Sequence, residues 1–359
     1  MKYTLQLLSM IKENPNLSNQ IAYFIDFSIQ EIPHIIYIAY EIGGTIYTDS
    51  VNTFNIIKNE YNNIKVKYFK SIDNIKNDII DHAIKIIIYP DYHIRFFKDI
   101  PDLKHVQVFH GISDKSYDYS KQVMDYDLFF IAGKDSYERY RKKGLLKKNT
   151  GRLIGYPKFD RVFKGEIKKD EIAKILNIDS NIPTVLYAPT WIDKALNSSW
   201  KKFYKKIILD KPDRLNLIIK PHPNIVRYRK KEIEECYSLA KGNSKIKILD
   251  KTHDITPILA VSDLLLGDVS SVTREFLAFK RPFVFLSNKP KWLWKKDKIK
   301  LWDCGDVVLR PDKLWKIVED SLNNPKKYIE NLEYHLKNTF YKPDGNAAKR
   351  AAEEILKLL

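Results

Sequence analysis

Short apolar runs alternate with longer amphipathic segments along most of this chain. In the first half, the apolar runs have the length and the β-branched or aromatic content of buried strands. Segments with helical spacing lie between them, for example at 31–42 and 72–83. Strands that alternate with helices predict a parallel sheet covered by helices. The predicted strands of this first series are 21–26, 45–48, 66–69, 84–89, 106–109 and 128–132.

A second series of the same kind fills the later part of the chain. The loop segment 151–160 and the charged stretch 164–174 separate the two series and predict a hinge. We therefore expect an α/β fold with two doubly wound Rossmann-type domains, residues 1–160 and 161–343, followed by a helix at 344–359. The second series comprises predicted strands at 184–188, 215–219, 246–249, 264–266 and 282–286, with helices near 198–209, 225–241, 254–261 and 271–280.

Length and composition agree with this division. A chain of 359 residues suits two domains, and 44% hydrophobic with 30% charged residues is typical of a soluble globular protein. No run approaches the roughly 18 apolar residues of a membrane span, and the N-terminus has no export signal, so we expect a cytoplasmic protein. Cys236 and Cys304 lie far apart without a partner motif, which predicts neither a disulfide framework nor a thiolate metal site.

The formal net charge of +17 favours an anionic partner such as a nucleotide, a phosphorylated polymer, nucleic acid or an acidic membrane leaflet. Part of the charge is explained equally well by solvent-exposed lysines that bind no partner, because the sequence uses Lys unusually often. Residues 289–302 interleave Lys and Trp, a pattern typical either of contact with an anionic membrane or of a loop that covers a core. No nucleic-acid module accompanies this pattern, so we expect no nucleic-acid partner.

Polar residues that could carry chemistry follow the predicted strands, where the loops of two facing α/β domains would meet across a cleft. Asp268, Ser270 and Ser271 follow the strand 264–266 and begin a helix. Hydroxyls beside the unpaired N–H groups of a first helical turn could bind phosphate oxygens, and Arg274 lies one turn further on. An ordinary Ser N-cap is the alternative.

Two further strand ends offer ligands for an anion. Thr190 follows 184–188, and Lys220 and His222 follow 215–219. Two prolines fix the backbone on either side of His222, which suits a rigidly placed ligand for a diphosphate. A stiff loop with an exposed imidazole is the alternative.

The first half contributes a candidate base and a candidate interdomain loop. His110 follows the strand 106–109 and could accept a proton from a hydroxyl, or could merely cap the strand. Gly155 and Lys158 lie in the hinge, where Lys158 could reach an anion, although a plain turn explains the loop equally well. Nucleotide-triphosphatase, zinc-protease and serine-hydrolase motifs are not found in the sequence.

Taken together in order, these motifs resemble the CDP-glycerol glycerophosphotransferase family of teichoic-acid and capsule synthesis. The resemblance implies a GT-B architecture with the nucleotide on the second domain, the acceptor on the first, and the last helix packed back on the first. It also implies peripheral membrane attachment and no cofactor or required metal. The motifs that carry it are Phe109-His110-Gly111, Gly155-Tyr156-Pro157 with Asp160, Leu186–Trp191, Lys220-Pro221-His222-Pro223, Asp268-Val269-Ser270-Ser271 and Asp344-Gly345.

The expected reaction is transfer of a polyol phosphate from a CDP-linked donor to a hydroxyl of a surface polymer or its lipid-linked precursor. His110 would be the base, and His222 with the hydroxyls would hold the diphosphate. The chain departs from the family pattern at Ile192, at Lys158-Phe159 and at Val269, which leaves the alcohol and the acceptor open. Two alternatives remain: a GT-B transferase that uses a nucleotide sugar such as CMP-sialate, whose acidic base motif is not found in the first domain, and a basic scaffold that binds polymer at a membrane.

Overall fold

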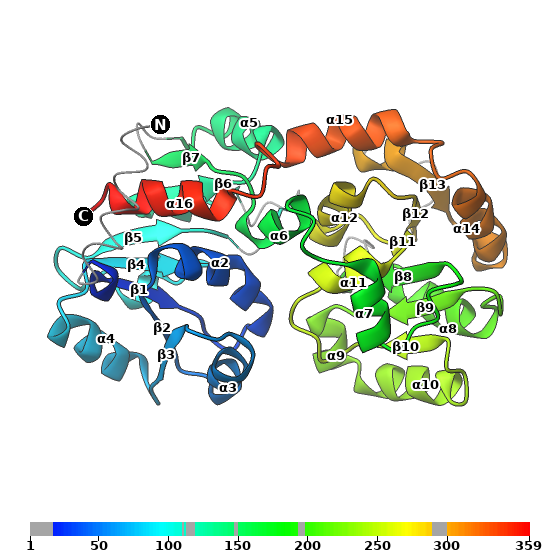
Figure 1. Ribbon diagram of the computed structural model, residues 1–359, viewed down its shortest axis with the longest axis horizontal. Coiled ribbons are helices and arrows are strands. Elements are labelled where there is room, and N and C mark those ends of the chain that lie inside the picture. Colours follow the sequence, from blue (N-terminus) through cyan, green and yellow to red (C-terminus); the bar gives the residue numbers. More distant parts are fainter. Residues whose placement is uncertain (1–16, 110, 113–118, 147–149, 193–197, 289–299) are drawn as a thin grey trace. The chain divides into compact units, whose positions relative to one another are not determined.

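A computed structural model describes residues 17–109, 111–112, 119–146, 150–192, 198–288 and 300–359. The chain divides into two compact units, which are described separately (Figure 1). Unit 1 comprises Met1–Lys164 and Lys337–Leu359, and unit 2 comprises Gly165–Leu336. Unit 2 thus spans 165–336, against the expected 161–343. None of the described helices is long and apolar enough to cross a lipid bilayer.

The core of unit 1 is a parallel sheet. Its strands are β1 (Ile21–Phe24), β2 (Thr45–Thr48), β3 (Lys65–Tyr68), β4 (Ile86–Tyr89), β5 (Lys104–Gln107), β6 (Leu128–Ile131) and β7 (Gly151–Leu153). They lie in the order β3-β2-β1-β4-β5-β6-β7, and the strand order reverses between β1 and β4. This is the doubly wound order, in which ligands bind outside the carboxyl ends of the strands at the reversal.

Helices cover both faces of this sheet, so the central strands β1, β4 and β6 are buried throughout. Ile21 and Tyr23 of β1 face one core cluster, whereas Ala22 and Phe24 face the other, as the alternation of a strand requires. The last helix contributes Ile355 to the first cluster. The helices of unit 1 are α2 (Ile32–Ile42), α3 (Val51–Glu60), α4 (Ile72–Asp81), α5 (Lys134–Lys142), α6 (Asp160–Phe163) and α16 (Ala347–Leu356).

Unit 2 repeats the architecture with a second parallel sheet. Its strands are β8 (Thr184–Ala188), β9 (Asn216–Ile219), β10 (Ile246–Ile248), β11 (Leu264–Gly267), β12 (Phe283–Leu286) and β13 (Gly305–Val308). The order is β10-β9-β8-β11-β12-β13, so the reversal falls between β8 and β11. These two strands approach closely at Gly267, where a Cβ would lie 2.7 Å from the Ala188 carbonyl oxygen. The helices are α7 (Lys169–Ile175), α8 (Trp200–Leu209), α9 (Pro223–Tyr228), α10 (Lys230–Ala240), α11 (Thr256–Val261), α12 (Ser271–Phe276), α14 (Leu314–Asn323) and α15 (Ile329–Thr339).

Two details correct the expected elements. The predicted helix 225–241 is two helices, because the backbone leaves helical geometry at Arg229, between α9 and α10. The edge strands β7 and β13 were not among the predicted strands. Both begin with Gly and are only partly buried, so they lack the continuous apolar run that marks a central strand.

Candidate functional site

Unit 2 collects its predicted ligands at the carboxyl ends of three neighbouring strands. Thr190 follows β8, His222 follows β9, and Ser270 follows β11. Because β9, β8 and β11 are adjacent and parallel, these ends span roughly 10 Å at the usual strand spacing. The group lies at the reversal of strand order in unit 2, the position at which doubly wound folds bind their ligands.

Asp268 joins two of these loops. Its carboxylate is buried and accepts the Thr190 N–H at 2.8 Å and the Ser199 N–H at 2.9 Å. An anion that already accepts two backbone N–H groups is a poor direct ligand for phosphate. These hydrogen bonds fix the loop after β8 against the loop after β11, and a role of Asp268 in donor binding stays a prediction.

The serines after β11 begin helix α12. Ser270 is the N-cap residue of a capping box with Thr273, whose hydroxyl accepts the Ser270 N–H at 3.3 Å. That hydroxyl also donates to the Asp268 carbonyl at 2.7 Å. The cap alternative is thus present in the structure, because the Ser270 side chain accepts the Thr273 N–H. Phosphate binding by Ser270, Ser271 and the other first-turn N–H groups stays a prediction. Arg274 belongs to the same helix and is buried.

His222 caps the neighbouring helix α9 in a way that fixes its tautomer. Its Nδ1 accepts the Asn224 N–H at 3.1 Å, so the proton of the neutral ring resides on Nε2. Nε2 is therefore a donor, the type of group that a diphosphate oxygen requires. Lys220 precedes it, largely buried, with its ammonium 3.4 Å from the Pro221 carbonyl oxygen.

The candidate base His110 lies outside the described residues. The residue before it, Phe109, has a φ of +63°, a left-handed conformation that is uncommon for a side chain of this size. Ring contacts hold it there, with centroids 5.4 Å from Tyr92 and 6.3 Å from Tyr140. Phe109 and Gly111 line a cavity of about 30 Å³, which has room for water but not for a substrate.

The hinge motif serves to hold the last helix. The Asp160 carboxylate accepts the N–H groups of Ala347 and Ala348 at 2.9 and 2.7 Å, the first turn of α16. Gly155, at a φ of +93°, passes so close that a Cβ would lie 2.7 Å from the Tyr341 carbonyl oxygen. Gly155 thus has a packing reason of its own, and phosphate contact by Gly155 stays a prediction.

The remaining predicted ligand in this loop is Lys158. Its side chain is largely buried, and its ammonium lies 5.9 Å from the centroid of the Phe159 ring. This contact orients the side chain but does not identify an anion. The predicted membrane segment 289–302 lies outside the described residues up to 299.

Sequence reasoning missed a polar group at the reversal in unit 1. Asp26 follows β1, and His93, which follows β4, places its Nε2 3.5 Å from the Asp26 carboxylate. Burial opposes ionisation of Asp26, but hydrogen bonds with His93 and the Ser28 N–H hold its pKa below the ordinary value. Burial, then the charges of Asp91 and Asp26, raise the pKa of Glu31 well above its ordinary value. The sequence could have indicated this group, because polar residues follow β1 and β4 just as they follow the strands of unit 2.

A family model described as CDP-Glycerol:Poly(glycerophosphate) glycerophosphotransferase matches residues 9–357. Among curated proteins, the teichoic acid poly(glycerol phosphate) polymerase of Bacillus spizizenii is 26% identical over 247 residues, which cover 66% of this chain and 61% of that protein. The teichoic acid glycerol-phosphate primase of Bacillus subtilis is 26% identical, with coverage of 46% and 41%. The chain therefore matches less than two thirds of these relatives' length.

Among solved structures, the wall teichoic acid polymerase TagF has a TM-score of 0.73 at 15% sequence identity, with 99% of this chain and 93% of that chain covered. A UDP-N-acetylglucosamine 2-epimerase of Listeria monocytogenes has a TM-score of 0.59 at 14% identity, with coverage of 92% and 94%. At such identities the likeness concerns the fold alone. With the two parallel sheets described above, it confirms the expected GT-B-like α/β class.

Proposed function

The chain belongs to the CDP-glycerol:poly(glycerophosphate) glycerophosphotransferase family, and we propose that it transfers a polyol phosphate from a CDP-linked donor to a hydroxyl group. The acceptor is a surface polymer or its lipid-linked precursor, and CMP is released. The observation that supports this proposal most strongly is the convergence of Thr190, His222 and Ser270 at the reversal of strand order in unit 2.

In the proposed reaction, the acceptor oxygen attacks the phosphorus that carries the polyol, and the bond from that phosphorus to the oxygen of CMP breaks. The hydroxyl proton passes to His110, and CMP departs with the electrons of the broken bond. The Nε2–H of His222 and the first-turn N–H groups of α12 donate to the diphosphate. Such donors offset the charge that develops on the leaving phosphate, so positioning and electrostatics supply most of the acceleration.

The proposal also includes the basic residues that attract the donor, the acceptor and the location of the protein in the cell. Lys220 and Arg274 add positive charge on unit 2, and Lys158 is an anion ligand on unit 1. Unit 1 receives the acceptor, and the protein works in the cytoplasm at the inner face of the membrane, with residues 289–302 as the contact. Capsule precursors also offer hydroxyl groups and are included among the proposed acceptors. The curated relatives support a glycerol-phosphate or ribitol-phosphate donor through their names.

The test is a panel of donors incubated with the purified chain and a glycerol-phosphate-primed lipid acceptor. We expect CMP release from CDP-glycerol or CDP-ribitol, in step with growth of the acceptor. Exchange of His110 for Ala should abolish turnover and leave CDP binding measurable. Turnover of CMP-sialate or a UDP-sugar alone would establish the glycosyltransferase alternative. Polymer binding without turnover of any donor, unchanged when His110 and His222 are both replaced, would establish the scaffold.

A further inference from the structure

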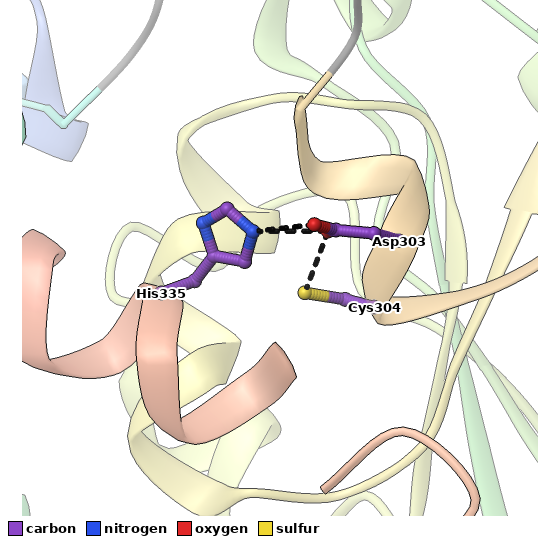
Figure 2. A group of neighbouring side chains, drawn as sticks. All are labelled: Asp303, Cys304 and His335. Carbon is purple, nitrogen blue, oxygen red and sulfur yellow. Dashed lines mark hydrogen bonds and ion pairs between the residues drawn. The ribbon is translucent and has the colours of Figure 1, made fainter. Parts of the chain in front are cut away.

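Three side chains with metal-binding atoms meet in unit 2, away from the strand ends of the proposed donor site. We propose that Asp303, Cys304 and His335 bind a divalent metal ion, with zinc as the ion that suits them (Figure 2). The proposal is independent of the transferase reaction. Sequence reasoning had set Cys304 aside as a lone cysteine, because the third group comes from a helix more than thirty residues further along the chain.

The three side chains lie close enough together for one ion to reach all of them. The ligand atoms all lie within 4.8 Å of one another. Nε2 of His335 lies 2.9 Å from Oδ1 of Asp303, and Sγ of Cys304 lies 3.5 Å from the same oxygen. Tetrahedral zinc with ordinary bond lengths separates a nitrogen and an oxygen ligand by ~3.3 Å and a sulfur and an oxygen ligand by ~3.5 Å. The sulfur–oxygen separation already fits these values, and the nitrogen–oxygen separation would widen by a few tenths of an ångström.

The ligand types select among metals. Thiolate and imidazole bind zinc and similar borderline ions, whereas calcium and magnesium require oxygen ligands throughout. Cys304 and His335 are almost fully buried, but the Asp303 side chain is 51% exposed, so an ion has an entry path and a water molecule can complete four-coordination. Burial raises the pKa of the Cys304 thiol, so binding releases its proton to solvent.

The local structure holds the three groups in place before any ion arrives. Asp303 and Cys304 end a short 3₁₀ turn immediately before β13. Asn331 and His335 lie one turn apart on α15, and Asn331 donates to the Asp303 carbonyl at 2.6 Å. Figure 2 shows the Asp303 and Cys304 side chains directed toward the imidazole on α15. A bound ion would therefore join α15 to the edge of the unit 2 sheet.

The alternative is a hydrogen-bonded Asp303–His335 ion pair with a protonated thiol beside it, which the distances also describe.

Cobalt substitution distinguishes a metal site from an Asp303–His335 ion pair beside a protonated thiol. The full chain is stripped with a chelator and titrated with Co²⁺ and then Zn²⁺, and absorption is recorded. We expect one equivalent of Co²⁺ to produce a thiolate-to-cobalt charge-transfer band that Zn²⁺ displaces. Zinc should also raise the melting temperature. Cys304→Ser should remove the band and weaken zinc binding by more than the ~10–100-fold that changes outside the ligand shell cause.

The second cysteine supplies the control. Cys236 is buried in α10, and Cys236→Ser should keep the band. If Cys304→Ser fails to fold, Asp303→Asn changes an exposed ligand and should still weaken zinc binding while the circular dichroism stays wild-type. A wild-type chain that shows no thiolate band, or an equal band in Cys304→Ser, would overturn the proposal.

Discussion

The two units share one strand order but place opposite chemistry at its reversal. In unit 2, the strand ends carry hydroxyls, an imidazole donor and helix N–H groups, and the carboxylate of Asp268 is occupied by two backbone N–H groups. In unit 1, the corresponding strand ends carry Asp26, Asp91 and His93, with Glu31 buried beside them. The same frame thus offers donors to an anion in one unit and acceptors in the other.

This difference explains why the net charge alone could not assign the site. A chain of +17 attracts anions everywhere, but an anion binds where donors converge and where a nearby carboxylate is already paired with other N–H groups. The reversal in unit 2 meets that condition. The described side chains at the reversal in unit 1 include carboxylates, which accept hydrogen bonds and repel an anion.

Among the substitutions that compare the two units, the largest effect is expected from His222→Ala. Loss of a donor to the developing charge should lower kcat by about 10²–10³, measured as CMP release from CDP-glycerol. His82→Ala is the control, because His82 is an exposed residue of unit 1 that bonds only within its own helix region. A His222→Ala enzyme as fast as the His82→Ala enzyme would contradict the assignment of the donor site.

A second comparison uses two aspartates with the same kind of hydrogen bonds, Asp268 in unit 2 and Asp160 in unit 1. Each is buried and accepts two backbone N–H groups, so Asp268→Ala and Asp160→Ala should each lower the free energy of unfolding by about 2–5 kcal/mol. Urea unfolding measures this loss. We expect only Asp268→Ala to weaken CDP binding as well, because its loop carries Thr190. Equal CDP affinity in the two variants would remove Asp268 from the donor site.

The carboxylates of unit 1 predict a pH dependence of stability. The pKa of Glu31 is raised well above its ordinary 4.5, so the folded state binds more protons than the unfolded state above pH 4.5. Stability should then fall as pH rises through the window between the two pKa values, by about 1.4 kcal/mol per unit for this group. Glu31→Gln should flatten that slope in urea unfolding between pH 4.5 and 8. A slope unchanged by the substitution would show that Glu31 ionises normally.

The smallest expected effect tests whether Ser270 binds the diphosphate or only caps its helix. Ser270 caps α12 in unit 2, and Ser71 caps α4 in unit 1, where its hydroxyl accepts the Asn74 N–H. Each Ser→Ala change should cost about 1 kcal/mol of stability. Only Ser270→Ala should also weaken CDP binding in calorimetry. If the two variants bind CDP alike, Ser270 is a cap and nothing more.

The fold was largely predictable because its central strands are buried on both faces. A parallel sheet covered by helices requires continuous apolar runs, and such runs mark β1, β4, β8 and β11 without ambiguity. The edge strands β7 and β13 were missed because one side of each needs no burial. Helix ends were harder, since the break at Arg229 leaves no Gly or Pro in the sequence to mark it.

The candidate site could be predicted from the sequence where its residues directly follow a predicted strand. Thr190, His222 and Ser270 could be found in this way because each belongs to the loop immediately after its strand. The Asp303, Cys304 and His335 cluster could not, because a helix brings its third member to an edge strand that the pattern did not reveal. Gly155 shows the converse, since a motif position can be fixed by packing against a distant segment.

The most direct test of the donor site is a calorimetric titration of the full chain with CDP and, in parallel, with cytidine. If the donors at the ends of β8, β9 and β11 hold a diphosphate, CDP should bind at least ~10²-fold more tightly than cytidine, as two or more charge-assisted hydrogen bonds require. Equal affinity for the two ligands, or binding of neither, would contradict the account.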